Sequence, residues 1–103
     1  MDQQRKEKIF KLLSRIPKGK VTTYKILAER SGIKNPRHIG QIIHKNKNPQ
    51  KFPCHRVIRS DGTVASGYAF GGHRKQVELL KKEGVKFSGQ KVLELDQKLV
   101  YPI

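Results

Sequence analysis

TTYKILAERSGIKNPRHIGQIIHK, residues 22–45, is the stretch that decides the fold of this 103-residue chain. Thr22 or Thr23 is suited to accept a hydrogen bond from the N–H groups of the following turn and so to begin a helix. Gly32 stands where a left-handed residue commonly ends a helix, and Asn35 is a good N-cap for the next one. The stretch therefore predicts two short helices that meet across a turn of a few residues.

The second of these helices has one apolar side and one basic side. Pro36 stands at its first position, where the missing N–H costs nothing, and isoleucines recur at i, i+3 and i+4 through about Lys45. A helix-turn-helix whose second helix is basic is typical of proteins that place it in a DNA groove, although short helical pairs also occur in proteins that bind no DNA. The polar side carries no acid and consists of Arg37, His38, Gln41, His44 and Lys45.

The charge of the chain also favours nucleic acid as a partner. The sequence has 23 Lys and Arg residues against 8 Asp and Glu, a net charge of +15. Such an excess repels itself in a compact fold unless a polyanion or counterions neutralise it, and nucleic acid is the obvious polyanion. A lysine-rich solubilising surface is the alternative interpretation.

Length and cysteine usage limit the organisation of the chain. A chain of 103 residues can bury one modest hydrophobic core, so we expect a single domain over 1–103 with no N-terminal accessory domain. One cysteine cannot form an internal disulfide, and Met1 to Lys8 are polar where a secretory signal needs an apolar segment. No apolar run approaches the length of a membrane span. We therefore expect a cytoplasmic protein that does not enter a membrane.

The sequence predicts further elements on both sides of the helix pair. Apolar spacing predicts a helix over about 2–15, and a Ser60-Asp61-Gly62 turn between β-branched segments predicts a hairpin. A glycine-rich loop, SGYAFGG at 66–72, precedes a helix over 73–84, and a small strand pair is expected around Ser88-Gly89. We therefore expect an α+β fold, a mainly helical winged helix-turn-helix domain with a small β-hairpin wing.

The only cysteine lies in KFPCHRVIRSDG, residues 51–62. Cys54 stands between a proline and His55, with Arg56 and Arg59 close in sequence, and positive neighbours favour a reactive thiolate. The alternative is a small buried apolar residue, which is what a lone cysteine usually is. In a regular strand Cys54 and His55 would face opposite sides, so a Cys–His relay requires an irregular turn or an intervening water.

Neither a metal nor a nucleotide cofactor is indicated. The four histidines are scattered and there is no second cysteine, so no zinc-ligand spacing exists. The glycine-rich segment GYAFGG lacks the lysine and Ser/Thr of a phosphate-binding loop. We therefore expect no cofactor and no metal.

PCHRV, Pro53 to Val57, resembles the active-site signature of the alkylguanine-DNA alkyltransferases, the methylated-DNA–protein-cysteine methyltransferases. It follows a helix-turn-helix and precedes a glycine-rich loop and a helix that ends in Glu83-Gly84, and the likeness covers about 16–85. The resemblance implies repair by direct reversal: irreversible, single-turnover transfer of an alkyl group from guanine oxygen-6 in duplex DNA to the protein's own cysteine. A monomer without an obligatory protein partner suffices for such a reaction.

The resemblance also implies roles for individual residues. Cys54 would be the alkyl acceptor, His55 the base that acts through a water, and Glu83 the residue that orients His55. Tyr24 would donate a proton to the leaving guanine, and Arg37 would fill the gap that the flipped nucleotide leaves in the base stack. The other predicted site residues are the DNA contacts Gln41, Lys45 and Arg56, the loop brace Asn46, and the pocket residues Pro53, Val57, Gly67, Tyr68, Gly71 and Gly72.

Two other functions stay open at this point. Alkyltransferase-like proteins bind and flip alkylated guanine without transferring the group, and they typically have another residue, often tryptophan, where this sequence has Cys54. Like this chain, they are short, whereas most transferases carry an additional N-terminal domain. A helix-turn-helix regulator without chemistry is the third possibility, but it explains neither PCHRV nor Glu83.

Overall fold

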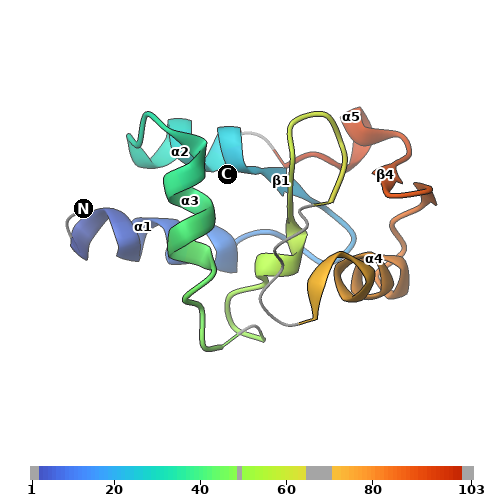
Figure 1. Ribbon diagram of the computed structural model, residues 1–103, viewed down its shortest axis with the longest axis horizontal. Coiled ribbons are helices and arrows are strands. Elements are labelled where there is room, and N and C mark those ends of the chain that lie inside the picture. The colour runs from blue at the N-terminus through green and yellow to red at the C-terminus, as the bar shows by residue number, and fades with distance from the viewer. Residues whose placement is uncertain (1–2, 49, 65–70, 101–103) are drawn as a thin grey trace.

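A computed structural model describes residues 3–48, 50–64 and 71–100 of the chain (Figure 1). The described residues form a mainly helical α+β fold, as predicted. Its elements are, in order, α1 (Gln3–Ser14), β1 (Thr22–Thr23), α2 (Tyr24–Ser31), α3 (Pro36–Ile43), a 3-10 turn (Cys54–Arg56), β2 (Val57–Ile58), α4 (Gly72–Lys82), β3 (Phe87–Ser88), β4 (Lys91–Val92) and α5 (Leu95–Lys98).

The helix-turn-helix forms with the predicted caps. The Thr23 hydroxyl accepts a hydrogen bond from the backbone N–H of Ile26 at 3.1 Å, which starts α2. Gly32 ends α2 with φ at 76°, a left-handed conformation that glycine adopts without a Cβ penalty. The Asn35 side chain accepts from the N–H of Arg37 at 3.0 Å and starts α3. Local sequence alone therefore specifies both helix starts and the turn between them.

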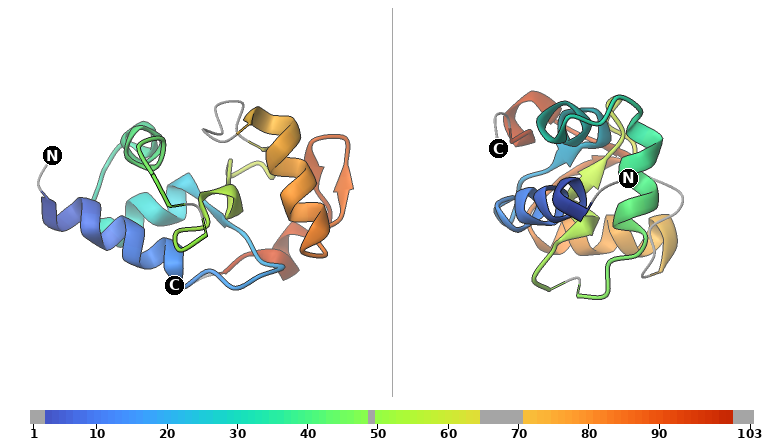
Figure 2. Two further views of the ribbon diagram at one scale, coloured as in Figure 1. Left: turned by 90° about the horizontal axis from the view of Figure 1, so that it is seen from below. Right: turned by 90° about the vertical axis from the view of Figure 1, so that its left-hand side faces the viewer.

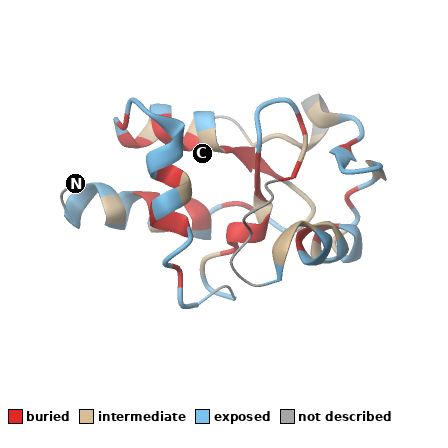
Figure 3. Cartoon of the chain, in the orientation of Figure 1, coloured by how far each residue is buried: buried red, intermediate tan, exposed pale blue. Residues whose placement is uncertain are grey.

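The buried apolar residues form two clusters on either side of β1 and β2. Helices α1, α2 and α3 cover the first cluster, which includes Cys54 and Val57. The second cluster lies under α4 and the strands β3 and β4. Figures 1 and 2 show α1–α3 at one end of the molecule and α4 with β3–β4 at the other. Buried residues concentrate along β1 and the 3-10 turn, between the two groups of helices (Figure 3).

The two segments that flank the turn at 60–62 do not pair with each other as predicted. The turn itself forms, because the N–H of Arg59 donates to the carbonyl of Thr63 at 2.9 Å. However, β2 pairs in parallel with β1, Val57 opposite Thr22, and Thr63 bridges to Lys91 instead. Val57 and Ile58 are fully buried, and a solvent-facing wing would expose their β-branched side chains. The antiparallel hairpin among the described residues is β3–β4, which the sequence predicted around Ser88-Gly89.

The helices α1 and α4 match the sequence prediction, whereas the segment around α5 does not. The predicted helices over 2–15 and 73–84 are confirmed as α1 and α4. The sequence predicted no element at α5, but the N–H of Val100, which follows α5, donates to the carbonyl of Val21 at 2.8 Å, so this segment lies beside β1. No helix within the described ranges is long and apolar enough to cross a membrane.

Candidate active site and nucleic-acid interface

Cys54 begins the 3-10 turn that connects a proline-containing loop to β2. The N–H of Cys54 donates to the carbonyl of Phe52 at 2.7 Å, and the N–H of Arg56 donates to the carbonyl of Pro53 at 3.0 Å. Val57 closes the turn with a bond from its N–H to the carbonyl of Cys54. The segment is therefore an irregular turn at Cys54, which is one of the two arrangements that would allow a Cys–His relay, the other being an intervening water.

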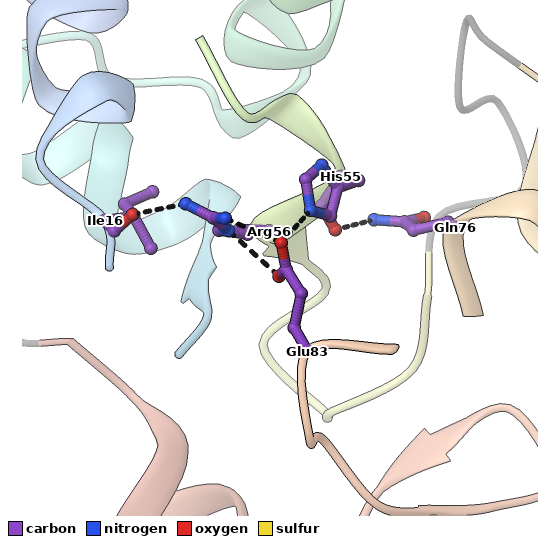
Figure 4. A network of polar contacts seen from close by, with 5 residues as sticks. All are labelled: Ile16, His55, Arg56, Gln76 and Glu83. Atoms are coloured by element: carbon purple, nitrogen blue, oxygen red, sulfur yellow. Dashed lines mark hydrogen bonds and ion pairs between the residues drawn. The ribbon is translucent and has the colours of Figure 1, made fainter. Parts of the chain in front are cut away.

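His55, Arg56 and Glu83 form one polar network at this turn (Figure 4). The His55 Nε2 atom lies 3.0 Å from Oε2 of Glu83. Arg56 donates from Nε to Oε1 of Glu83 at 3.0 Å and from Nη2 to Oε2 at 2.6 Å. Both carboxylate oxygens are thus hydrogen-bonded. Glu83 is the C-cap of α4, so the end of this helix delivers the carboxylate to a residue 28 positions earlier in the chain.

The pKa shifts at this site favour the neutral forms of Cys54 and His55. Burial raises the pKa of the Cys54 thiol, which a hydrogen bond with Asn46 opposes only in part. Burial lowers the pKa of His55, and the hydrogen bond with Glu83 does not fully offset it. For Glu83 burial acts to raise the pKa, but hydrogen bonds from Arg56 and His55 outweigh it and lower the value. At neutral pH the site therefore holds a thiol, a neutral imidazole and a carboxylate.

The positive neighbours of Cys54 consequently do not have the effect expected from the sequence. Arg56 was expected to favour the thiolate and to contact DNA, but its guanidinium is directed into the protein. Besides Glu83, it donates from Nη1 to the carbonyl of Ile16 at 2.7 Å, and its side chain is only 16% exposed. Arg56 thus links the segment that follows α1 to the end of α4. Because its guanidinium is directed inward and paired with Glu83, it is not placed to contact DNA.

Asn46, which follows the end of α3, braces the loop before Cys54. Asn46 donates from Nδ2 to the carbonyl of Phe52 at 2.8 Å and accepts from the N–H of Asn48 at 2.9 Å. The same Phe52 carbonyl accepts from the N–H of Cys54. Asn46 is buried, as is Pro53 beside the cysteine. Asn46, which was expected to brace this loop, therefore donates to the same carbonyl as the N–H of Cys54, that of Phe52.

A cleft of about 690 Å³ lies between α2, α3 and the turn at 59–61. Tyr24 is half-buried on its wall, and α3 approaches it so closely that a Cβ on Gly40 would lie 3.9 Å from the tyrosine ring. Burial raises the pKa of Tyr24, a thiolate on Cys54 would raise it further, and the charge of Arg59 opposes both. Tyr24 is thus within electrostatic reach of Cys54. The cleft is lined by Tyr24, Lys25, Glu29, Lys34, Pro36, Arg37, Gly40, Arg59, Ser60 and Asp61.

The exposed side of α3 carries the predicted DNA-binding residues. Arg37 is exposed and lines the cleft just described. Gln41 and Lys45 are also exposed and line a smaller hollow, about 240 Å³, between α1 and α3. These three residues form one polar surface that ends at the Tyr24 cleft.

The predicted pocket residues have different locations. Val57 is fully buried in β2, where it belongs to the core and not to a pocket surface. Gly71 has φ at 130°, and a Cβ there would lie 2.6 Å from Cβ of Lys75, so the position admits only glycine. Gly72 is the first residue of α4. Gly67 and Tyr68 lie outside the described residues.

Sequence reasoning missed Gln76, a polar residue in the middle of α4. It is 1% exposed, and its Nε2 donates to the carbonyl of His55 at 2.9 Å and to that of Val57 at 2.8 Å. Its position four residues before the buried Leu80 places it on the inward side of the helix, which is the signal that could have identified it. We find no group of three or more potential metal ligands in the described part of the chain.

The chain matches a family model and several curated proteins. The model described as "6-O-methylguanine DNA methyltransferase, DNA binding domain" matches residues 4–85. The methylated-DNA–protein-cysteine methyltransferase of Methanothermobacter thermautotrophicus is 42% identical over 83 residues, 81% of this chain and 46% of that protein. The protein of the same name from Saccharolobus islandicus is 45% identical over 78 residues, 76% of this chain and 49% of that protein. The chain spans about half the length of these relatives.

Solved structures resemble the fold to different extents. The structure of S. pombe Atl1 in complex with damaged DNA containing O6-carboxymethylguanine has a TM-score of 0.83 and 28% identity, and the match covers 99% of each chain. The O6-methylguanine-DNA methyltransferase of Pyrococcus kodakaraensis has a TM-score of 0.65 and 32% identity, covering 82% of this chain and 48% of that one.

Proposed function

This chain belongs to the family of the 6-O-methylguanine DNA methyltransferase DNA-binding domain, and on that premise we propose that it repairs DNA by transferring an alkyl group from guanine oxygen-6 to Cys54. The observation that carries the proposal is the contact of 3.0 Å between His55 and Glu83, directly beside the cysteine. Nucleophile, base and orienting carboxylate are the parts that nucleophilic catalysis requires.

Duplex DNA binds along the exposed side of α3, and the family resemblance implies that α3 enters the minor groove of the DNA. Arg37, Gln41 and Lys45 contact the DNA there, and the lesion rotates out of the base stack into the cleft beside Tyr24. Unstacking costs a few kcal/mol, less for a poorly paired lesion. Arg37 lies where α3 borders the cleft, so it is the residue placed to occupy the gap in the stack.

Transfer begins from the neutral thiol. His55 donates from Nε2 to Glu83, which leaves Nδ1 to accept the thiol proton through a water. The sulfur of Cys54 attacks the alkyl carbon, the bond from that carbon to oxygen-6 breaks, and the leaving guanine takes a proton from the Tyr24 hydroxyl. The imidazolium of His55 then returns a proton to Tyr24 through solvent, so that overall the alkyl group replaces the thiol proton on Cys54 and guanine gains that proton. Thiols exchange with disulfides but do not cleave the C–S bond of a thioether, so the alkylated Cys54 is not regenerated and each molecule acts once.

Binding of alkylated guanine without transfer is the second candidate. The match to S. pombe Atl1 with damaged DNA extends over 99% of both chains, whereas the match to the archaeal methyltransferase covers 48% of that protein. The similarity of the whole fold to Atl1 therefore supports binding without transfer. The presence of Cys54, with His55 and Glu83 beside it, supports alkyl transfer.

Intact-protein mass spectrometry separates the two candidates. The protein is mixed with duplex DNA that contains one O6-methylguanine, and Cys54→Ser is treated in the same way. We expect a gain of one methylene mass on Cys54 and none in the variant. Tight binding to the lesion without any gain in mass would contradict the transfer and support recognition alone.

A further inference from the structure

Gln76 is a buried polar residue that takes no part in the steps above. Its Nε2 contacts two backbone carbonyls, that of His55 at 2.9 Å and that of Val57 at 2.8 Å. Figure 4 shows the amide reaching the His55 carbonyl from the side opposite Arg56. The two carbonyls lie in the 3-10 turn and in β2, so one side chain joins both segments to α4.

The surroundings determine which way the amide points. Rotating it by half a turn would place Oε1 against two carbonyl oxygens, neither of which can donate a hydrogen bond. In the orientation present, Oε1 has no hydrogen-bond partner among the described residues although it is buried. An unpaired buried acceptor costs free energy. The side chain is thus suited to this position by its two N–H donors and not by its acceptor.

Helix α4 holds His55 at two points. Gln76 binds the backbone carbonyl of His55, and Glu83, about two helical turns later, binds its ring at 3.0 Å. With both contacts in place, neither the peptide nor the imidazole can turn independently of α4. The direction of the ring relative to Cys54, the preceding residue, is thereby determined.

We propose that Gln76 is a positioning residue: it fixes the backbone of His55 so that Glu83 holds the imidazole in the orientation needed for proton transfer from Cys54. The proton transfer rests on the function proposed above, whereas the fixed position of His55 does not. A positioning error of about 1 Å can slow such a reaction by about a hundredfold.

Two substitutions and a control test the proposal. Gln76→Met keeps the volume but removes both donors, and Gln76→Lys restores them, because an ammonium group carries three N–H donors and no acceptor. Val77→Ala alters the neighbouring half-buried residue of α4, whose apolar side chain packs on the second hydrophobic cluster and can donate to neither carbonyl. If Gln76→Met does not fold, Gln76→Asn, whose amide is one methylene too short, takes its place.

The first measurement is an NMR titration of the His55 imidazole, which does not depend on alkyl transfer. We expect a pKa below 6.5 in the unmodified protein and in Val77→Ala, because both keep His55 buried against Glu83. In Gln76→Met the pKa of His55 should move toward its ordinary value. In Gln76→Lys the imidazole of His55 should keep the chemical shifts of a single fixed conformation.

The second measurement is the rate of methyl transfer from duplex DNA to Cys54. We expect it to fall by about tenfold or more in Gln76→Met, to recover in Gln76→Lys to within about threefold, and DNA affinity to change in neither. If Gln76→Met matches Val77→Ala in both the titration and the rate, the positioning role is wrong. If the unmodified protein transfers no methyl group, the proposed function fails, and the His55 titration alone then decides for or against the position of the ring.

Discussion

Glu83, like Arg56, makes three side-chain hydrogen bonds at the site. Its carboxylate accepts from His55 and twice from Arg56, and Arg56 also donates to the carbonyl of Ile16. One residue thus serves the proposed chemistry and the attachment of α1 to α4. Because both side chains of the Arg56–Glu83 pair are less than one fifth exposed, removing one partner leaves the other charge buried.

Glu83→Gln should destabilise the protein by about 3 kcal/mol, since it leaves Arg56 buried without a counter-charge. The measurement is the free energy of unfolding in urea. The matched control is Glu78→Gln on the same helix, whose ion pair with Lys82 is 3.9 Å long and exposed, and which should cost less than about 0.5 kcal/mol. Equal effects of the two substitutions would contradict the role assigned to Glu83.

Burial of His55 predicts the pH dependence of stability. Its pKa is lowered from 6.5 in the folded protein, so the unfolded chain binds the proton more readily. Stability is therefore fully present above about pH 6.5 and is lost as the pH falls through the folded pKa. The lowered pKa of Glu83 acts in the same direction at lower pH.

The check is to measure urea unfolding at several pH values between about 7.5 and 5 for the protein and for His55→Gln. We expect a steeper loss of stability toward low pH in the unmodified protein. Parallel curves would show that His55 is not the group responsible.

At the scale of elements, the helix-turn-helix contains two glycines with different backbone conformations, Gly32 and Gly40. Gly32 has φ at 76°, and a Cβ added there would meet nothing within 4 Å, so its cost on substitution is conformational only. Gly40 lies inside α3 with helical geometry, where glycine is the less stable choice. Substitutions at the two positions should therefore change stability in opposite directions.

We expect Gly32→Ala to destabilise the protein by about 1 kcal/mol, because alanine is strained at positive φ. Gly40→Ala should stabilise it by up to about 1 kcal/mol, because the new methyl group only reaches ordinary contact with the ring of Tyr24 at 3.9 Å. Thermal unfolding of both variants tests this. A loss of stability in Gly40→Ala would mean that α3 packs on α2 more tightly than the distance indicates.

At the scale of the whole molecule, the basic surface and the candidate site lie on connected elements. The exposed side of α3 leads to the Tyr24 cleft, and the turn that carries Cys54 lies between the two hydrophobic clusters. The net charge of +15 thus accompanies a cleft that opens beside the exposed side of α3.

DNA affinity should depend steeply on salt, because phosphate neutralisation releases counterions. We expect a loss on the order of a thousandfold between about 50 and 200 mM salt if several phosphates are contacted. Fluorescence anisotropy with a labelled duplex measures it. An affinity that does not change with salt would contradict binding through this surface.

Much of the fold followed from the sequence because the signals that specify it are local. The caps at Thr23, Gly32 and Asn35 act over two to four residues, so each short stretch of sequence contains both partners of the contact. The sequence predicted two hairpins on equally good turn signals. The one around Ser88-Gly89 formed as β3–β4, whereas at Asp61-Gly62 only the turn formed, and the strand before it pairs with β1. Which flanking segments then pair depends on burial, which a turn signal does not encode.

By itself, the sequence determined the helix-turn-helix, the basic side of α3 and the resemblance carried by PCHRV, since each consists of neighbouring residues. Only the tertiary structure decided that Arg56 faces inward, that β2 pairs with β1, and that Gln76 holds the His55 carbonyl. These contacts join residues between 21 and 40 positions apart, and no local pattern specifies which distant group a polar side chain will meet. Which distant groups meet is decided by how the two hydrophobic clusters pack against β1 and β2, and by the need of each buried polar group for a hydrogen-bond partner.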